Sequence, residues 1–246
     1  MLPLLPIKTA VTDSTVAIMI ELVQGEGGIN IATQEYVKTI RELCDSKGML
    51  FIADEVQTGM ARTGTMFGFQ HYGIKPDVMC LAKALGGGLP IGAMVVKKEL
   101  ADVFKPGMHG STFAGSPVIC QAALGVFKAI HADKLIPNTK KMGVYLMNQL
   151  NALKQKHAII SEVRGLGLMV GVELTIEGAQ IFKECFDRGL IINCTQGNVL
   201  RIMPALNVTK KQIDKALFIL DKAIETVVAN NGVIASAAKQ SGLKKD

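Results

Sequence analysis

The fold is decided by two apolar stretches that each end in a charged residue, Met49-Leu50-Phe51-Ile52-Ala53-Asp54 and Val78-Met79-Cys80-Leu81-Ala82-Lys83. Neither stretch alternates polar with apolar residues, which is typical of strands buried in a parallel sheet. A helical pattern precedes the first stretch, with Thr33 as the N-cap and Gly48 at the helix end. This alternation of strand and helix predicts βαβ units.

The surrounding sequence extends this pattern over residues 1–134. Val16–Ile20 is a further expected strand, and Gly86-Gly87-Gly88 leads into another at Ile91–Val96. We therefore expect an α/β fold: part of a large domain with a mostly parallel sheet and helices on both faces. Ser116-Pro117 predicts the start of a helix that is apolar nearly all round and hence buried.

A change of character after residue 134 predicts a small C-terminal α+β domain over residues 135–230. A long amphipathic helix is followed by alternating strands, a short helix, and a last helix that opens with the capping box Thr209-x-x-Gln212. The expected elements after the long helix are a strand-like stretch at Glu162–Leu174, a helix at Ala179–Arg188 and strands at Leu190–Cys194 and Val199–Met203. Residues 231–246 lack a sustained period and are interpreted as a tail that can be disordered.

Composition narrows the classes of function. Of 246 residues, 49% are hydrophobic and 20% charged, as in a packed globular protein. The net charge of +6 forms no concentrated basic footprint and there is no Trp, so no nucleic-acid partner is expected. Met1–Lys8 has no charged region of a signal peptide, and no membrane span is predicted. Five cysteines without C-x-x-C spacing favour the reducing cytoplasm.

Asp54 and Lys83 carry the most chemical information. Each ends an apolar strand, and ligands bind at the carboxyl ends of strands in open α/β sheets, so both side chains are expected in one crevice. Pyridoxal phosphate requires such a pair: a lysine for its aldehyde and an acid for its pyridine nitrogen. The alternative is a structural ion pair between the two residues.

Some of the remaining motifs allow two interpretations, and others are excluded by the sequence. Arg201 lies in an otherwise apolar strand and needs a carboxylate from a ligand or from the protein, for which Glu26 is a candidate. Ser111 and Thr112 are hydroxyls for phosphate or substrate, or only the turn before a helix. There is no P-loop and no metal-binding cluster. The glycines from Gly165 lie in a strand pattern and not before a helix, so they are not a dinucleotide fingerprint.

Two long motifs then resemble the class III aminotransferases, pyridoxal phosphate enzymes of fold type I. They are Asp54-Glu55-Val56-Gln57-Thr58-Gly59-Met60-Ala61-Arg62-Thr63-Gly64 and Lys83-Ala84-Leu85-Gly86-Gly87-Gly88-Leu89-Pro90-Ile91-Gly92-Ala93. Four further stretches are most similar to the members that act on N-acetylornithine: Gln24-Gly25-Glu26-Gly27-Gly28, His109-Gly110-Ser111-Thr112-Phe113, the stretch from Val163 to Glu173, and the stretch from Asn193 to Arg201.

The resemblance assigns a role to each site residue. It implies that Lys83 is the catalytic lysine and that the cofactor is held by Asp54, Glu55, Val56, Gln57, Lys83 and Thr112. Thr112 would reach the cofactor phosphate of the neighbouring subunit, so the active site would be shared in a homodimer. Ser111 would contact substrate, and Arg201 would bind the carboxylate of 2-oxoglutarate or glutamate with Glu26 as its counterion.

The implied reaction transfers the δ-amino group of N-acetylornithine to 2-oxoglutarate, a step of arginine biosynthesis. The family's N-terminal part, with its phosphate-binding loop, has no counterpart here, so we expect the C-terminal portion of a longer enzyme. Two alternatives stay open. The amine could instead be ornithine, 4-aminobutyrate or a lysine-pathway amine, or the chain could be a catalytically silent fragment that forms dimers.

Overall fold

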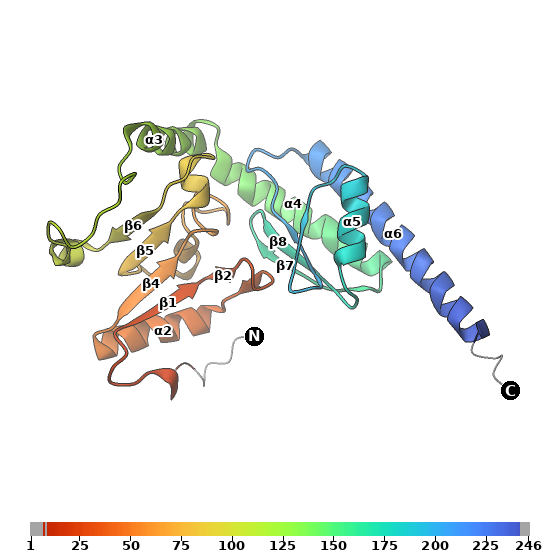
Figure 1. The fold of residues 1–246 in the computed structure, drawn as a ribbon, viewed down its shortest axis with the longest axis horizontal. Helices are drawn as coiled ribbons and strands as arrows, with labels where there is room; N and C mark the ends of the chain where they lie inside the picture. The colour runs from red at the N-terminus through yellow and green to blue at the C-terminus, as the bar shows by residue number, and fades with distance from the viewer. Residues whose placement is uncertain (1–6, 8, 242–246) are drawn as a thin grey trace.

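A four-stranded sheet with the order β1-β4-β5-β6 occupies the first half of the chain (Figure 1). The computed structural model describes residue 7 and residues 9–241, with only the backbone for 231–241. Strands β1 (Ala17–Glu21), β4 (Leu50–Asp54) and β5 (Val78–Leu81) are parallel, and β6 (Ala93–Val96) is antiparallel. The mostly parallel sheet is therefore confirmed.

Helix α2 (Gln34–Lys47) covers one face of this sheet. The Thr33 side chain accepts a hydrogen bond from the Tyr36 amide, and Gly48 ends the helix in the left-handed conformation with φ 64°. Val37, Ile40 and Cys44 of α2 are buried against Phe51 and Ala53 of β4. The predicted cap residues are thus the observed ones.

The second face of the sheet is not covered by any helix among the described residues, although the sequence predicted helices on both faces. Met19 of β1 and Met94 of β6 lie on this face and are 57% and 52% exposed. The apolar composition of the strands indicates two covered faces, but the described part of the chain supplies only one layer.

Helix α3 (Pro117–Ala132) differs from the expectation in the same way. It packs on the short 3₁₀ helix Lys83–Gly86 through the side that carries Ala123 and Ile130. Val118 and Leu124 are 73% and 51% exposed, so the helix is not buried all round. The described residues offer no surface for its outer side.

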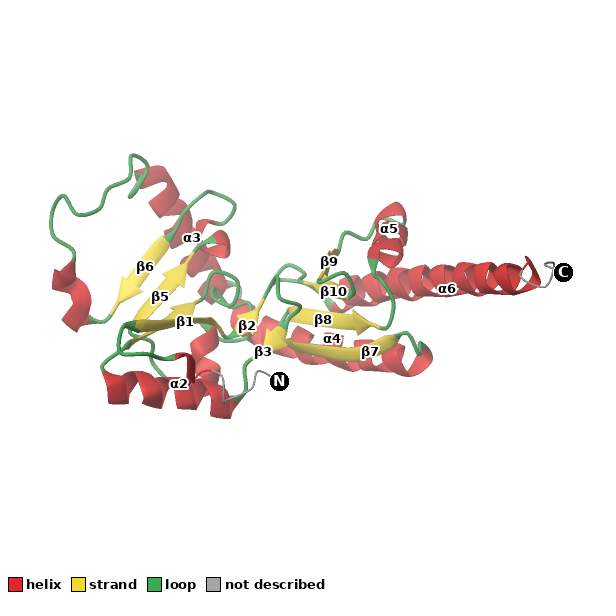
Figure 2. Ribbon diagram, turned by 60° about the horizontal axis from the view of Figure 1, so that its bottom comes forward, coloured by secondary structure: helices red, strands yellow, loops and turns green. Residues whose placement is uncertain are grey.

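The second unit is a four-stranded antiparallel sheet with the order β7-β8-β10-β9, packed against helices (Figure 2). Its core includes Leu146, Leu150, Val170, Leu200 and Leu220. The elements are α4 (Leu135–Lys156), β7 (Ile160–Leu166), β8 (Met169–Leu174), α5 (Ala179–Asp187), β9 (Asn193–Thr195), β10 (Val199–Ile202) and α6 (Lys210–Ser241). The stretch read as one strand from Glu162 is a hairpin, because Gly167 turns the chain with φ 60°.

A hairpin that the sequence did not predict links the two units. Its strands β2 (Val23–Gln24) and β3 (Asn30–Ile31) are too short to give a periodic signal. The Arg164 side chain of β7 donates to the carbonyls of Gly28 at 2.7 Å and Ile29 at 3.2 Å. These bonds hold the hairpin loop against the second unit.

Helix α6 begins at the predicted capping box, in which the Thr209 amide donates to Gln212 at 2.8 Å. It extends away from the body of the molecule to Ser241 (Figure 1). The structure continues the helix through residues 231–241, part of the tail in which the sequence shows no sustained period. No proline follows Pro204, and Gly232 is the residue there that favours a helix least. Residues 242–246 lie outside the described residues, and none of the described helices is both long and apolar enough to span a membrane.

Candidate active site

The two residues that carry the prediction stand at the same edge of the first sheet. Asp54 is the last residue of β4 and lies opposite Cys80 of β5 in the register of the sheet. Lys83 stands three residues after Cys80 and is the first residue of the 3₁₀ helix Lys83–Gly86. Its φ of 46° is uncommon for a residue with a side chain and reflects a sharp turn at the strand end. Such backbone conformations cluster at functional sites.

Asp54 and Lys83 do not form the structural ion pair that was the alternative. The Asp54 carboxylate accepts one hydrogen bond, from the Val56 amide at 3.0 Å. Among the described residues no side chain forms an ion pair with either of them. Asp54 is half-buried and Lys83 is exposed. An uncommitted carboxylate and an uncommitted amine at neighbouring strand ends fit a ligand with an electrophilic carbon and a protonated nitrogen.

Glu55 points the other way, with its carboxylate bound by groups of the loop after β4, and its role as a cofactor-binding residue stays a prediction. The residue is 1% exposed, and its carboxylate accepts hydrogen bonds from Thr58 Oγ1 at 2.5 Å and from the amides of Gly68 at 2.8 Å and Phe69 at 2.7 Å. Burial raises the pKa of the Glu55 carboxyl, although these hydrogen bonds act in the opposite direction. These hydrogen bonds hold the loop after β4 in place. Glu55 faces away from Asp54 because consecutive residues of an extended chain face opposite sides.

Glu26, Gln57 and Arg201 come together from three different elements. Arg201 Nη1 of β10 donates to Glu26 Oε1 at 2.6 Å and to Gln57 Oε1 at 3.4 Å. The hydrogen bond from Arg201 lowers the pKa of the Glu26 carboxyl, and the charge of Lys83 contributes in the same direction. The Lys83 charge therefore lies near this cluster, and the arginine has the protein carboxylate that the sequence suggested.

Gly25 leaves the space in which Gln57 lies. A Cβ atom at Gly25 would stand 2.3 Å from Gln57 Nε2. The Gly25 amide is held by Glu21 Oε2 at 2.9 Å, at the carboxyl end of β1. The glycine is therefore part of the site, although the sequence signal at this position was only a glycine-rich turn.

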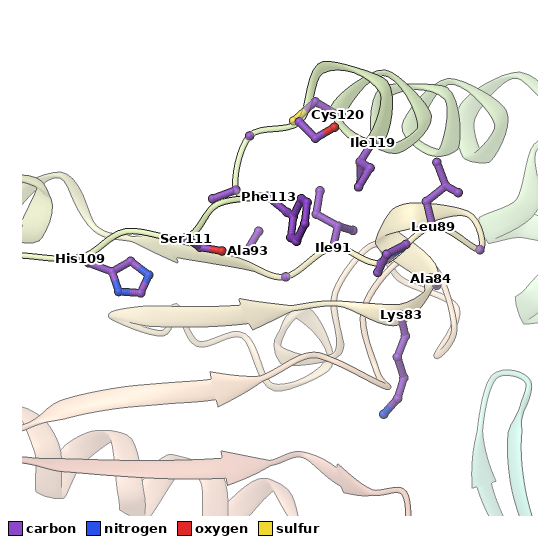
Figure 3. A pocket seen from close by; sticks show the side chains of 16 residues that line it. Lys83, Ala84, Leu89, Ile91, Ala93, His109, Ser111, Phe113, Ile119 and Cys120 are labelled. Atoms are coloured by element: carbon purple, nitrogen blue, oxygen red, sulfur yellow. The ribbon is translucent and has the colours of Figure 1, made fainter.

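Ser111 and Thr112 lie on an exposed loop before α3. Ser111 lines an open cavity of about 1190 Å³ together with His109, Phe113 and Lys83 (Figure 3). The Lys83 side chain, however, directs its amine away from Ser111 and Phe113 (Figure 3). Within one chain, Ser111 is thus not brought to the amine of Lys83 (Figure 3).

The described residues contain no cluster of His, Cys, Asp and Glu that could hold a metal ion. The geometry is that of an amine, an acid and a carboxylate-binding arginine around one edge of a sheet, and known proteins share the sequence that builds it. Residues 4–224 match the family model described as aminotransferase class-III. The chain belongs to the class III aminotransferases. The resemblance seen in the two long motifs is therefore confirmed.

Individual class III relatives agree with this assignment. The acetylornithine aminotransferase of Methanocaldococcus jannaschii is 50% identical over 223 residues, which are 90% of this chain and 56% of the relative. That of Caldanaerobacter subterraneus is also 50% identical, over 89% of this chain and 56% of the relative. The chain thus spans about half the length of the curated relatives it matches.

Solved class III structures confirm the α/β fold. The ornithine δ-aminotransferase of Plasmodium falciparum has a TM-score of 0.88 and 33% identity, covering 93% of this chain and 61% of that structure. The acetylornithine aminotransferase of Elizabethkingia anophelis has a TM-score of 0.81 and 34% identity, covering 85% and 54%. The ornithine aminotransferase of Toxoplasma gondii, reported with partial occupancy of PLP at its active site, has a TM-score of 0.88 and 32% identity, with 93% and 55% covered.

Two arginines help to assemble the site although the sequence assigned them no role, Arg62 and Arg164. Arg62 stands inside the long motif, and its side chain donates to the carbonyls of Leu168 and Pro204. Arg164 holds the hairpin that carries Glu26. Both are arginines in apolar or glycine-rich surroundings, which is the signal that could have marked them.

Proposed function

We propose that this chain carries the catalytic residues of a pyridoxal phosphate-dependent aminotransferase that transfers the δ-amino group of N-acetylornithine to 2-oxoglutarate. The observation that carries the proposal is the uncommitted pair of Asp54 and Lys83 at neighbouring strand ends. Relatives named acetylornithine aminotransferase, at 42–50% identity, support the choice of amine.

The residues at the strand ends fit pyridoxal phosphate. Bound there, the cofactor supplies an aldehyde that an amine can attack and a protonated ring that withdraws electrons. Asp54 would hold the proton on the ring nitrogen, and Lys83 would offer its amine and then carry a proton to and from the reacting carbon. Val56 would pack on the ring, and Gln57 would reach the ring hydroxyl. The phosphate would be held outside these residues, in part by Thr112.

Arg201 would bind the carboxylate of 2-oxoglutarate or glutamate. The Arg201 side chain is 14% exposed and that of its present partner, Glu26, is 71% exposed, so the carboxylate of Glu26 can leave while Arg201 stays in place. An incoming dicarboxylate could then take the vacated hydrogen bond. The exposure of Ser111 likewise leaves it available to a substrate.

We further propose that the active site is completed in a homodimer. Thr112 is exposed and belongs to a segment that presents large apolar side chains to solvent: Met108, Phe113, Val118 and Leu124 are between 51% and 82% exposed. Contiguous exposed apolar surface of this kind marks an association site. The five cysteines are free, which fits the reducing cytoplasm as the compartment.

The test is covalent trapping of the cofactor. Two samples are used: the chain alone, and the chain joined to the part of a relative that it does not match. Each is mixed with pyridoxal phosphate, and binding is followed by the absorbance at the border of the ultraviolet and visible range. The samples are then reduced with borohydride, and the labelled peptide is identified by mass spectrometry. We expect label on Lys83 and its loss in K83A. Label on another lysine, or no label in the joined chain, would contradict the proposal.

A panel of amines then decides the substrate. Because ornithine δ-aminotransferases are among the similar structures, ornithine and 4-aminobutyrate are compared with N-acetylornithine. We expect the highest kcat/KM with N-acetylornithine. A folded dimer that transaminates none of these amines would favour the alternative of a silent dimer-forming chain.

A further inference from the structure

A half-buried arginine joins the two units of the molecule without a counterion among the described residues. Arg62 Nη1 donates to the carbonyls of Pro204 at 2.6 Å and Leu168 at 3.1 Å. Among the described residues no carboxylate pairs with it, and burial lowers the pKa of its guanidinium to about 10. Removing a cation from water is costly unless hydrogen bonds satisfy it, and here two main-chain carbonyls accept hydrogen bonds from the guanidinium.

The main chain of Arg62 takes part in the same contact. Its carbonyl accepts a hydrogen bond from the Leu168 amide at 3.1 Å, so Arg62 holds Leu168 through both its side chain and its backbone. Gly167 permits this approach, because a Cβ there would stand 2.5 Å from the carbonyl carbon of Thr63. A Cβ at Gly143 of α4 would in turn stand 2.4 Å from the Gly167 carbonyl oxygen. Two glycines thus let three segments of backbone touch.

The contact of Arg62 with Leu168 and Pro204, called the joint below, lies between the two segments that carry Gln57 and Arg201. Gln57 is five residues before Arg62 in the same loop, and Pro204 is three residues after Arg201. The Arg62 side chain therefore ties the end of β10, from which Arg201 projects, to the loop that carries Gln57. The distances from Arg201 to Glu26 and to Gln57 depend on the relative placement of the two units.

We propose that Arg62 is a positioning residue for Arg201, which sets the carboxylate-binding guanidinium at its distance from Glu26 and Gln57. The part of Arg201 in binding substrate rests on the function proposed above, but the joint itself does not. A single nitrogen of Arg62 makes both bonds, so the three-donor ammonium of a lysine, on a side chain one bond shorter, carries enough donors for both carbonyls. The side chain of methionine fills similar space without a donor.

The first test reads the protein without cofactor or substrate. R62M, R62K and the wild-type chain are treated with phenylglyoxal, which modifies accessible guanidinium groups, and the rate at each arginine is followed by mass spectrometry. R188M is the matched control, since Arg188 is an arginine whose side chain bonds Glu184 and Thr226 within the second unit. Arg41, which binds Asp77 within the first unit, reports on the integrity of the fold.

We expect Arg201 to react several-fold faster in R62M than in wild type, while R62K and R188M keep the wild-type rate and Arg41 stays unchanged. An unchanged rate at Arg201 in folded R62M would overturn the proposal. An equal rise at Arg41 and Arg201 in both R62M and R62K would also overturn it, because Arg62 would then serve only the stability of the fold.

The second test uses transamination by the chain joined to the missing part of a relative. We expect R62M to raise KM for 2-oxoglutarate at least several-fold with a smaller change in kcat, and R62K to restore it. Loss of kcat with unchanged KM would contradict the positioning role. Absence of transamination in the wild-type enzyme would instead count against the proposed function, while the phenylglyoxal rates would still decide the role of Arg62.

Discussion

Arg201 of β10 and Glu26 of the β2–β3 hairpin form a 2.6 Å ion pair across the boundary between the two units. They are 175 residues apart in the sequence. The hydrogen bond from Arg201 lowers the pKa of Glu26, so the carboxylate stays ionised under mildly acidic conditions. Because the arginine is mostly covered and the glutamate mostly exposed, the pair is arranged so that one partner is fixed and the other is free to exchange.

This arrangement predicts that the ion pair contributes little to stability. Ion pairs with an exposed partner are typically worth at most about 1 kcal/mol, so E26Q is expected to change the free energy of unfolding by less than that. In the joined, active enzyme the same variant should bind 2-oxoglutarate more tightly, since Arg201 loses a competitor. Urea unfolding and the KM for 2-oxoglutarate measure the two effects, and a loss of several kcal/mol would show that Glu26 is structural.

Asp77 should make stability depend on acid pH. Burial acts to raise its pKa, but the bonds from Lys97, the Phe51 amide and Arg41 outweigh burial and lower the pKa to about 2. A carboxyl with a lowered pKa stabilises the fold above its unfolded value of 3.8 and loses that effect as the pH falls towards 2.

We therefore expect the difference in unfolding free energy between wild type and D77N to shrink by about 2 kcal/mol between pH 5 and pH 2. Urea unfolding over this range measures it. A difference that does not change with pH would contradict the role of the ionised carboxylate.

Replacing Gly25 by alanine should affect function without much effect on stability. The new Cβ meets only the terminal amide of Gln57, which is flexible and can move away, so G25A should cost less than about 1 kcal/mol. The displaced Gln57 can no longer contact Arg201. Transamination in G25A should therefore fall to the rate of Q57A, and the double variant should be no slower than either single one. Additive losses would show that Gly25 acts independently of Gln57.

Gly167 should be among the least replaceable glycines. Alanine there must adopt φ 60° and also approach the Thr63 backbone at 2.5 Å, so G167A should lose about 2–4 kcal/mol. Gly48 is the control, because it has φ 64° with nothing within 4 Å, and G48A should lose only about 1 kcal/mol. Equal losses for the two variants, measured by thermal unfolding, would show that the close approach is unimportant.

Glu55 is expected to behave as a structural residue. E55Q places an amide group where two backbone amides and Thr58 donate, so the variant should lose about 1–3 kcal/mol of stability. The exposed residue Glu99 provides the control variant E99Q. In the joined enzyme, E55Q molecules that remain folded should bind pyridoxal phosphate with wild-type affinity, and weaker binding at equal stability would restore Glu55 to the cofactor site.

Much of the fold was predictable because its signals are local. Thr33 and Gly48 mark the ends of α2 through their own backbone preferences, and Thr209 and Gln212 do so for α6. The covering of the first sheet was not predictable in this way. Apolar strands indicate that both faces are buried, but they do not say which part of the protein covers Met19 and Met94.

The sequence by itself determined that Asp54 and Lys83 each follow a buried strand, because the length of each apolar run and the charged residue after it are local properties. That the two strands pair side by side is seen in the structure. Only the tertiary structure decided that Glu55 turns inward, that Glu26 reaches Arg201, and that Arg62 bonds carbonyls 106 and 142 residues away. These contacts depend on how the two units pack, and packing is set by shape and by close backbone approach at Gly143 and Gly167, which no local period encodes.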